Sequence, residues 1–175
     1  GKTADHPKDA GKFAGAVSGN LPLARERFEA ALATLTDHFT VDGSKTAAIG
    51  YCFGGGIVLQ MARLGVDIDG VVSYHGSLAS DIRASKDKLK AAVRVFHGAA
   101  DPFIKAEHVA ALKAEMEAAD ADFRFVEYPD VKHGFTNPGA TRMGEKFDLP
   151  LMYDAYADLD SWKKTQKFFD KLFDR

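Results

Sequence analysis

The chain has 175 residues, of which 46% are hydrophobic and 27% charged, and its formal net charge is −2. These ordinary globular values give no reason to expect nucleic acid or an anionic membrane as a partner. A single cysteine excludes an internal disulfide and fits a cytoplasmic location. No apolar run approaches the ~18 residues that a membrane span needs. The length predicts one domain over residues 1–175.

The N-terminal segment is polar, and we expect residues 1–20 to form a loop with at most one helical turn. A helix is predicted to begin after Asn20, because asparagine is a good N-cap and Pro22 is tolerated in a first turn. Its apolar stripe is predicted to consist of Phe28, Leu32, Leu35 and Phe39.

From residue 46 onward, short apolar strands alternate with helical patterns. Strands are predicted at about 46–51, 69–74, 92–97 and 123–128, and helices after the first strand, at about 103–119 and at about 157–173. The last helix is predicted to bury Leu159, Trp162, Phe169 and Leu172. This alternation predicts an α/β fold in three layers, with a mostly parallel sheet covered on both faces. Ligands of such sheets bind beyond the carboxyl ends of the strands.

The first strand runs into Gly50-Tyr51-Cys52-Phe53-Gly54, which has the spacing of a nucleophile elbow with cysteine in the nucleophile position. We expect glycine on both sides because a Cβ at either flank would collide with the strand or the helix. The following helix N-terminus would favour the thiolate of Cys52. On this motif alone, a small buried core cysteine is an equally good interpretation.

Two further side chains follow strand ends. Asp101 comes after the third predicted strand, and His133 comes after the fourth. The chain order nucleophile, acid, histidine is that of the α/β hydrolases. His133 would activate the thiol, and Asp101 would orient the imidazole. Taken singly, Asp101 reads as a turn or cap residue and His133 as a loop residue, so their joint placement carries the prediction.

Two other histidines, His75 and His97, also stand at strand ends. We interpret both as packed, hydrogen-bonded structural residues. No histidine, cysteine or carboxylate cluster has the spacing of metal ligands, so we predict neither a metal site nor a cofactor.

With these residues assembled, the chain resembles the dienelactone hydrolase family of the α/β-hydrolase superfamily over nearly its whole length. The matching stretches are Asn20–Arg25, Gly50–Gly55, Ser73–Gly76, His97–Phe103 and His133–Pro138. The resemblance implies a Cys52-Asp101-His133 triad, no cofactor, and hydrolysis of a small ester or lactone in the cytoplasm. It also implies an oxyanion contact from the backbone amide of Phe53, and substrate contacts from Tyr51, Phe103, Phe135 and Asn137.

The chain departs from this family in two respects. Family members carry further N-terminal residues that form the first strands of the sheet and supply a second oxyanion donor. We therefore predict an N-terminally incomplete domain that lacks this part of the sheet, with a further segment docked along residues 46–51 to cover the open edge. Asn137 stands where lactone-specific members have an arginine for the substrate carboxylate, so the predicted substrate is a small ester or lactone in general.

Two alternatives to a hydrolase stay open. The chain could be a non-catalytic or truncated hydrolase-like domain, which the absent strands favour. It could also be a thiol redox sensor that uses Cys52, although it has no second cysteine to resolve a sulfenic acid.

Overall fold

The computed structural model describes residues 2–174, and the chain forms two compact units, residues 1–44 and residues 45–175. The prediction of one domain over residues 1–175 stays a prediction. Within the described residues, no helix is both long enough and apolar enough to cross a membrane.

The N-terminal unit contains α1 (Pro7–Ser18) and α2 (Leu21–Thr36). Helix α1 corrects the expected loop over residues 1–20. Its start is set by Pro7 in the first turn and by the His6 side chain, which accepts a hydrogen bond from the Lys8 amide at 3.2 Å. Two internal glycines weaken the helical pattern in the sequence, and none of the residues of α1 is buried.

Helix α2 begins where the sequence predicted. The Asn20 side chain accepts a hydrogen bond from the Leu23 amide at 3.2 Å, which satisfies one of the free N–H groups of the first turn. The helix ends at Thr36, so Phe39 lies beyond it and is 91% exposed. The predicted stripe is therefore wrong at its last residue.

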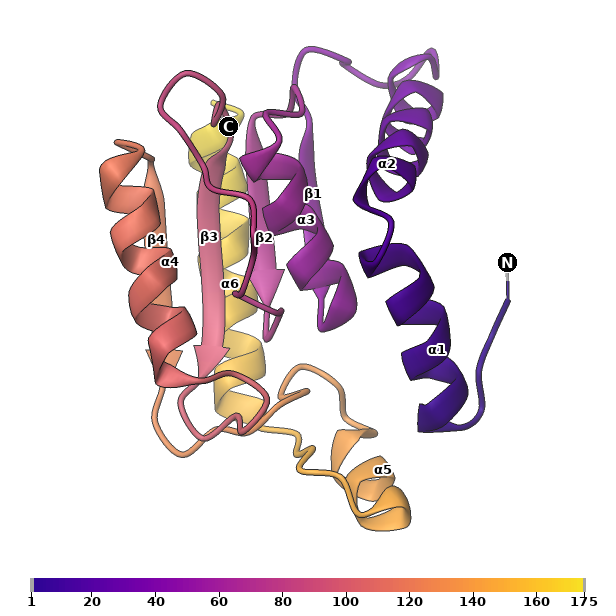
Figure 1. Cartoon of the computed structure of the whole chain (residues 1–175). Coiled ribbons are helices and arrows are strands. Elements are labelled where there is room, and N and C mark those ends of the chain that lie inside the picture. The colour runs from indigo at the N-terminus through magenta and orange to yellow at the C-terminus, as the bar shows by residue number, and fades with distance from the viewer. Residues whose placement is uncertain (1, 175) are drawn as a thin grey trace. The chain divides into compact units, whose positions relative to one another are not determined.

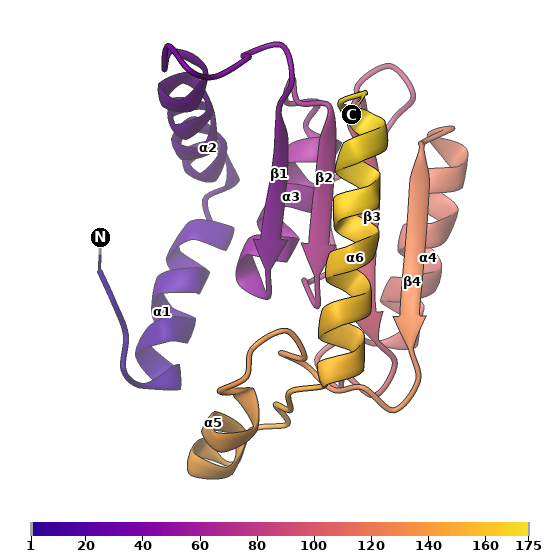
Figure 2. The same ribbon diagram turned by 180° about the vertical axis from the view of Figure 1, so that it is seen from behind.

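The second unit is built on one sheet of four parallel strands in the order β1-β2-β3-β4. The strands are β1 (Ala47–Tyr51), β2 (Gly70–Tyr74), β3 (Ala92–Gly98) and β4 (Phe123–Tyr128). Helices α3 (Phe53–Arg63) and α4 (Ala106–Ala118) cover one face, and α6 (Ala155–Leu172) covers the other (Figure 1 and Figure 2). The predicted three-layer α/β architecture is confirmed.

All four strands point their carboxyl ends to the same edge of the sheet, where α5 (Ala140–Phe147) also lies (Figure 1). Helix α5 was not predicted from the sequence, because Gly139 precedes it without a capping side chain and Gly144 interrupts it. Among the described residues, β1 pairs only with β2 and so forms one side edge of the sheet. The predicted docking of a further segment along residues 46–51 stays a prediction.

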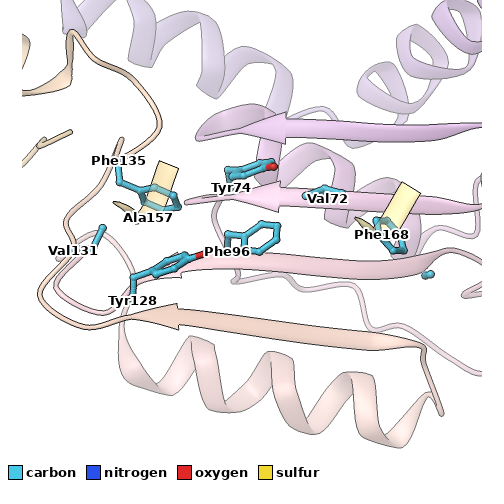
Figure 3. Close-up of a cluster of buried hydrophobic side chains, with 9 residues drawn as sticks. Val72, Tyr74, Phe96, Tyr128, Val131, Phe135, Ala157 and Phe168 are labelled. Carbon is cyan, nitrogen blue, oxygen red and sulfur yellow. The ribbon is translucent and has the colours of Figure 1, made fainter. Parts of the chain in front are cut away.

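The main hydrophobic cluster lies between the sheet and α6 and continues into the loops after β4 (Figure 3). It consists of Val72, Tyr74, Ala92, Phe96, Tyr128, Val131, Phe135, Ala157 and Phe168. Phe169 and Leu172 of α6 pack against it as predicted. Leu159 and Trp162 are instead 58% and 43% exposed, which corrects the predicted buried face of α6.

The true buried face of α6 carries Ala157, Ser161, Thr165 and Phe168. Its polar members are hydrogen-bonded: the Thr165 hydroxyl pairs with the Tyr74 hydroxyl at 2.5 Å, and the Ser161 hydroxyl donates to a main-chain carbonyl. Buried hydroxyl groups are tolerated when they have partners, so hydrophobicity alone could not locate this face.

Candidate active site

Cys52 lies in the sharp turn between β1 and α3. Its backbone has φ 52° and ψ −116°, a conformation that residues other than glycine rarely adopt. A Cβ on Gly50 would lie 2.1 Å from the carbonyl oxygen of Gly54, so this position requires glycine. A Cβ on Gly54 would meet nothing within 4 Å, which corrects the expectation of a collision at both flanks.

The structure brings together the three side chains that the sequence placed beyond β1, β3 and β4. Cys52 Sγ lies 3.1 Å from His133 Nε2, and His133 Nδ1 lies 2.7 Å from Asp101 Oδ2. The other oxygen of Asp101 accepts a hydrogen bond from the Phe103 amide at 2.9 Å, which fixes the carboxylate. Asp101 and His133 are buried, whereas Cys52 is exposed. Only the thiol is therefore open to a molecule that arrives from solvent.

The loops that carry the acid and the histidine are hydrogen-bonded to each other. The amide of Ala99 donates to the carbonyl of Tyr128 at 2.9 Å, and that of Ala100 donates to the carbonyl of Val131 at 3.0 Å. A Cβ on Gly98 would lie 2.3 Å from the Val131 oxygen, so glycine permits this close approach. The distance from Asp101 to His133 is thus set by main-chain contacts as well as by the side chains.

Electrostatics favours an ionised thiol in this arrangement. The hydrogen bond from His133 lowers the pKa of Cys52 and outweighs burial, and the charge of His133 and the backbone amide of Phe53 lower it further. Burial by itself would lower the pKa of His133, but the hydrogen bonds to Asp101 and Cys52 outweigh it and raise that pKa to about 9. A thiolate beside an imidazolium is the form that attacks electrophilic carbon.

The four residues that were predicted to contact substrate differ in their exposure to solvent. Tyr51 and Phe103 are partly exposed near the thiol, and the Phe103 ring stands edge-on to His133 at 5.1 Å. Phe135 is 0% exposed and belongs to the hydrophobic cluster, and the substrate contact predicted for it stays a prediction. Asn137 is exposed, but its side-chain oxygen accepts a hydrogen bond from the Gly139 amide at 2.9 Å. The oxyanion role of the Phe53 amide stays a prediction.

The two histidines interpreted as structural differ in their surroundings. His75 is packed and hydrogen-bonded through both ring nitrogens, to the amide of Cys52 and to the hydroxyl of Thr136. His97 is also buried, but its Nδ1 has no hydrogen-bond partner among the described residues, so the expectation holds only in part for it. His75 follows β2 directly, as Cys52 follows β1. Because parallel strands end at the same edge of the sheet, this position in the sequence already indicated that His75 lies near Cys52.

No group of three or more histidine, cysteine or acidic side chains within residues 2–174 is placed to hold a metal ion.

The family model of the dienelactone hydrolase family matches residues 3–173. The chain belongs to the dienelactone hydrolase family. This member is 34% identical over 151 residues to the uncharacterized protein K02A2.1 of Caenorhabditis elegans, an alignment that covers 85% of this chain and 94% of that protein.

Solved structures share the fold of this dienelactone hydrolase family member. A dienelactone hydrolase-like promiscuous phosphotriesterase from metagenomic libraries is 33% identical, with a TM-score of 0.84 over 93% of this chain and 66% of that one. An α/β hydrolase from a deep-sea metagenome library is 20% identical, with a TM-score of 0.70 over 86% of this chain and 65% of that one, and shares the fold. The chain spans about half the length of its bacterial curated relatives, 47% in the case of one from Yersinia pestis.

Proposed function

We propose that this protein hydrolyses small esters or lactones through a thioester on Cys52. The observation that carries the proposal is the hydrogen-bonded chain from Cys52 Sγ to His133 Nε2 at 3.1 Å and from His133 Nδ1 to Asp101 at 2.7 Å. Membership of the dienelactone hydrolase family supports the same reaction class. A nucleophile, a base within hydrogen-bond reach and a group that orients the base are what covalent acyl transfer needs.

In the first half-reaction, the Cys52 thiolate attacks the carbonyl carbon and forms a C–S bond. In this proposal the backbone amide of Phe53, at the start of α3, donates one hydrogen bond to the resulting oxyanion. When the tetrahedral intermediate collapses, the C–O bond breaks and the leaving alkoxide takes the proton from His133 Nε2. In a lactone this alkoxide stays attached to the acyl group. The product on the enzyme is a thioester.

In the second half-reaction, His133 acts as the base. It takes a proton from water, and the hydroxide attacks the thioester carbon. The C–S bond then breaks and releases a carboxylic acid and the Cys52 thiolate. Asp101 keeps the imidazole oriented throughout, because its carboxylate accepts the hydrogen bond from Nδ1.

Turnover of p-nitrophenyl acetate by site variants tests this proposal. Cys52→Ala and His133→Ala should each reduce turnover by at least ~10²-fold, and Asp101→Asn by a comparable factor, since each removes one link of the proton path. His108→Ala, on α4, is the matched control and should retain activity. Intact-mass spectrometry of the acetylated enzyme should place one acetyl group on Cys52. Wild-type turnover no faster than the uncatalysed reaction, and equal to that of Cys52→Ala, would instead favour a non-catalytic hydrolase-like domain.

One relative suggests a second substrate class. The solved structure at 33% identity is a promiscuous phosphotriesterase, and a thiolate can attack phosphorus as well as carbon. We therefore propose paraoxon as a second probe, with the same variants. Loss of ester and paraoxon turnover together in Cys52→Ala would assign both reactions to one thiol.

The redox alternative has its own readout. A sensor should form a stable sulfenic acid on Cys52 with dilute peroxide and show no ester turnover, whereas a hydrolase shows turnover before any oxidation. We also propose a cytoplasmic location, in keeping with a chain that has one cysteine and no disulfide. Cell fractionation against a cytoplasmic marker tests it.

A further inference from the structure

We propose that His75 is a positioning residue that ties the nucleophile elbow to the loop of His133 through its two ring nitrogens. The inference rests on the proposed function, in which Cys52 attacks and His133 serves as the base. His75 lies directly after β2, at the sheet edge where Cys52 and the other candidate catalytic side chains meet, and it is 4% exposed. It is therefore inside the site rather than at its rim.

The first contact of His75 is with the backbone of the nucleophile. The amide of Cys52 donates to His75 Nδ1 at 3.2 Å and to the carbonyl of Tyr74 at 3.0 Å. Since the Cys52 backbone has an unfavourable positive φ, it keeps this conformation only while its surroundings hold it. The imidazole supplies one of the two acceptors that do so, and the direction of the thiol follows from the backbone.

The second contact reaches the histidine loop. Because Nδ1 accepts a hydrogen bond, the neutral ring carries its proton on Nε2. Nε2 therefore donates to the hydroxyl of Thr136, at 2.9 Å, three residues after His133. One ring thus joins the two chain segments that bear the proposed nucleophile and base.

Ring packing adds a third restraint. His75 stands edge-on to His133, with ring centroids 4.9 Å apart, and edge-on to the fully buried Phe135 at 5.1 Å. The ring of Tyr51 is tilted relative to that of His75, with its centroid at 6.2 Å. His133 is therefore flanked by His75 and by Phe103, which limits the rotation of its imidazole.

These contacts need the neutral ring. A protonated His75 could not accept from the Cys52 amide, and it would set a positive charge beside that of His133. Burial and the nearby charge of His133 lower the pKa of His75 to about 4, with Asp101 opposing the shift. The titratable groups around His75 are Cys52, His133 and Asp101, and the His75 ring is neutral near pH 7.

Alkylation of Cys52 by iodoacetamide as a function of pH tests the role, because the chain has one cysteine and the reaction needs no ester turnover. His75→Phe keeps a ring but has no acceptor, and should slow alkylation at pH 6.5 by roughly five- to tenfold, the size of one or two ordinary hydrogen bonds. His75→Asn offers an oxygen close to Nδ1 and tolerates the positive φ of this position, so it should recover to within about twofold of wild type.

Thr136→Val tests the other end of the bridge. It removes the hydroxyl at nearly constant shape and should slow alkylation by about twofold to fivefold, whereas adding it to His75→Phe should cause no further loss. His97→Phe alters the other buried strand-end histidine and should leave alkylation unchanged. Thermal unfolding of each variant separates loss of positioning from loss of the fold.

Three results would overturn the inference. The first is a folded His75→Phe variant whose Cys52 is alkylated at the wild-type rate. The second is a His75→Asn variant of equal stability that is alkylated as slowly as His75→Phe, and the third is a His97→Phe variant that is alkylated as slowly as His75→Phe. If His75→Phe fails to fold, His75→Asn and Thr136→Val still decide, because a positioning role predicts near-wild-type alkylation in the first and a loss in the second. Failure of the proposed function would look different: the wild-type protein would show no ester turnover, while the alkylation rates of the variants would still follow the pattern expected above.

Discussion

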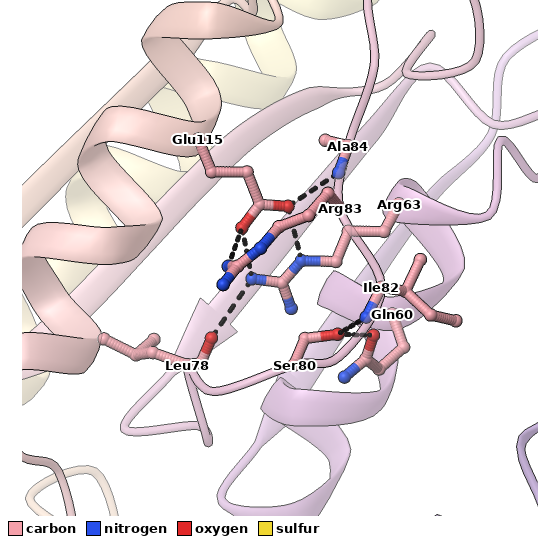
Figure 4. Close-up of polar contacts among 8 residues, drawn as sticks. All are labelled: Gln60, Arg63, Leu78, Ser80, Ile82, Arg83, Ala84 and Glu115. Atoms are coloured by element: carbon pink, nitrogen blue, oxygen red, sulfur yellow. Dashed lines mark hydrogen bonds and ion pairs between the residues drawn. The ribbon is translucent and has the colours of Figure 1, made fainter.

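Replacing Glu115 on α4 by glutamine should cost about 3 kcal/mol of unfolding free energy, at the lower end of the range for breaking a buried ion pair. Glu115 Oε1 accepts from Arg63 Nε at 2.9 Å, and its other oxygen accepts from Arg63 Nη2 at 3.0 Å (Figure 4). The Arg63 side chain is 0% exposed. Arginine keeps its charge at all accessible pH values, so in Glu115→Gln a buried guanidinium loses its counter-ion.

Removing the other partner, in Arg63→Met, should cost less unfolding free energy at pH 4 than at pH 7. Burial opposes ionisation of Glu115, but hydrogen bonds from Arg63 and from the Ala84 amide outweigh it and lower the pKa of this carboxyl. In wild type this stabilisation is therefore present above the unfolded pKa and is lost as the pH falls through the folded one. In Arg63→Met, burial without the guanidinium should raise the folded pKa of Glu115, so the variant should gain stability relative to wild type on going from pH 7 to pH 4.

Urea unfolding at pH 7 and pH 4, followed by circular dichroism, measures both effects. Asp67→Asn is the control: Asp67 pairs with Lys90 at 3.0 Å on the surface, and its loss should change stability by less than about 0.5 kcal/mol. A loss below about 1 kcal/mol in Glu115→Gln would refute the reasoning, as would a gap between Arg63→Met and wild type that widens on acidification.

Three further predictions concern the site itself. The iodoacetamide rate of wild-type Cys52 should rise with a midpoint below about 8.5, since His133 lowers the pKa of the thiol; a midpoint at the value of free cysteine would contradict this. Gly50→Ala should cost at least ~1–3 kcal/mol in thermal or urea unfolding, because its Cβ would lie 2.1 Å from a carbonyl oxygen, while Gly54→Ala meets open space and should leave stability nearly unchanged. Phe103→Ala should lower kcat/KM for phenyl acetate by about twofold to tenfold and leave it nearly unchanged for a short aliphatic ester, if the exposed ring contacts aromatic substrate.

The sequence predicted the four strands because apolar runs bounded by turns are a local signal. It also predicted that Cys52, Asp101 and His133 would meet, because parallel strands end at one edge of a sheet and the chain order was informative. The contact distances confirm that the side chains come together; their chemistry stays a proposal.

The features that the sequence did not reveal depend on long-range partners or on weak local signals. Arg63 and Glu115 are 52 residues apart, and nothing near either residue marks it as buried. Ser161 and Thr165 are polar but buried, because they find hydrogen-bond partners that only the fold supplies. Helix α5 has no side-chain cap to mark its start in the sequence. Helix α1 buries none of its residues, so its sequence has no strong apolar periodicity from which to predict it.

Cys52 and His133, the proposed nucleophile and base, lie 81 residues apart in the chain, and this separation has a consequence for biosynthesis. At ~5–20 residues per second, roughly 4–16 s pass between incorporation of Cys52 and incorporation of His133. During that interval the nascent chain carries an ordinary thiol, with no imidazole to ionise it. On the proposed mechanism, the reactive form of Cys52 would therefore arise only after β4 has been made, and this order of synthesis would protect the growing polypeptide from premature acylation.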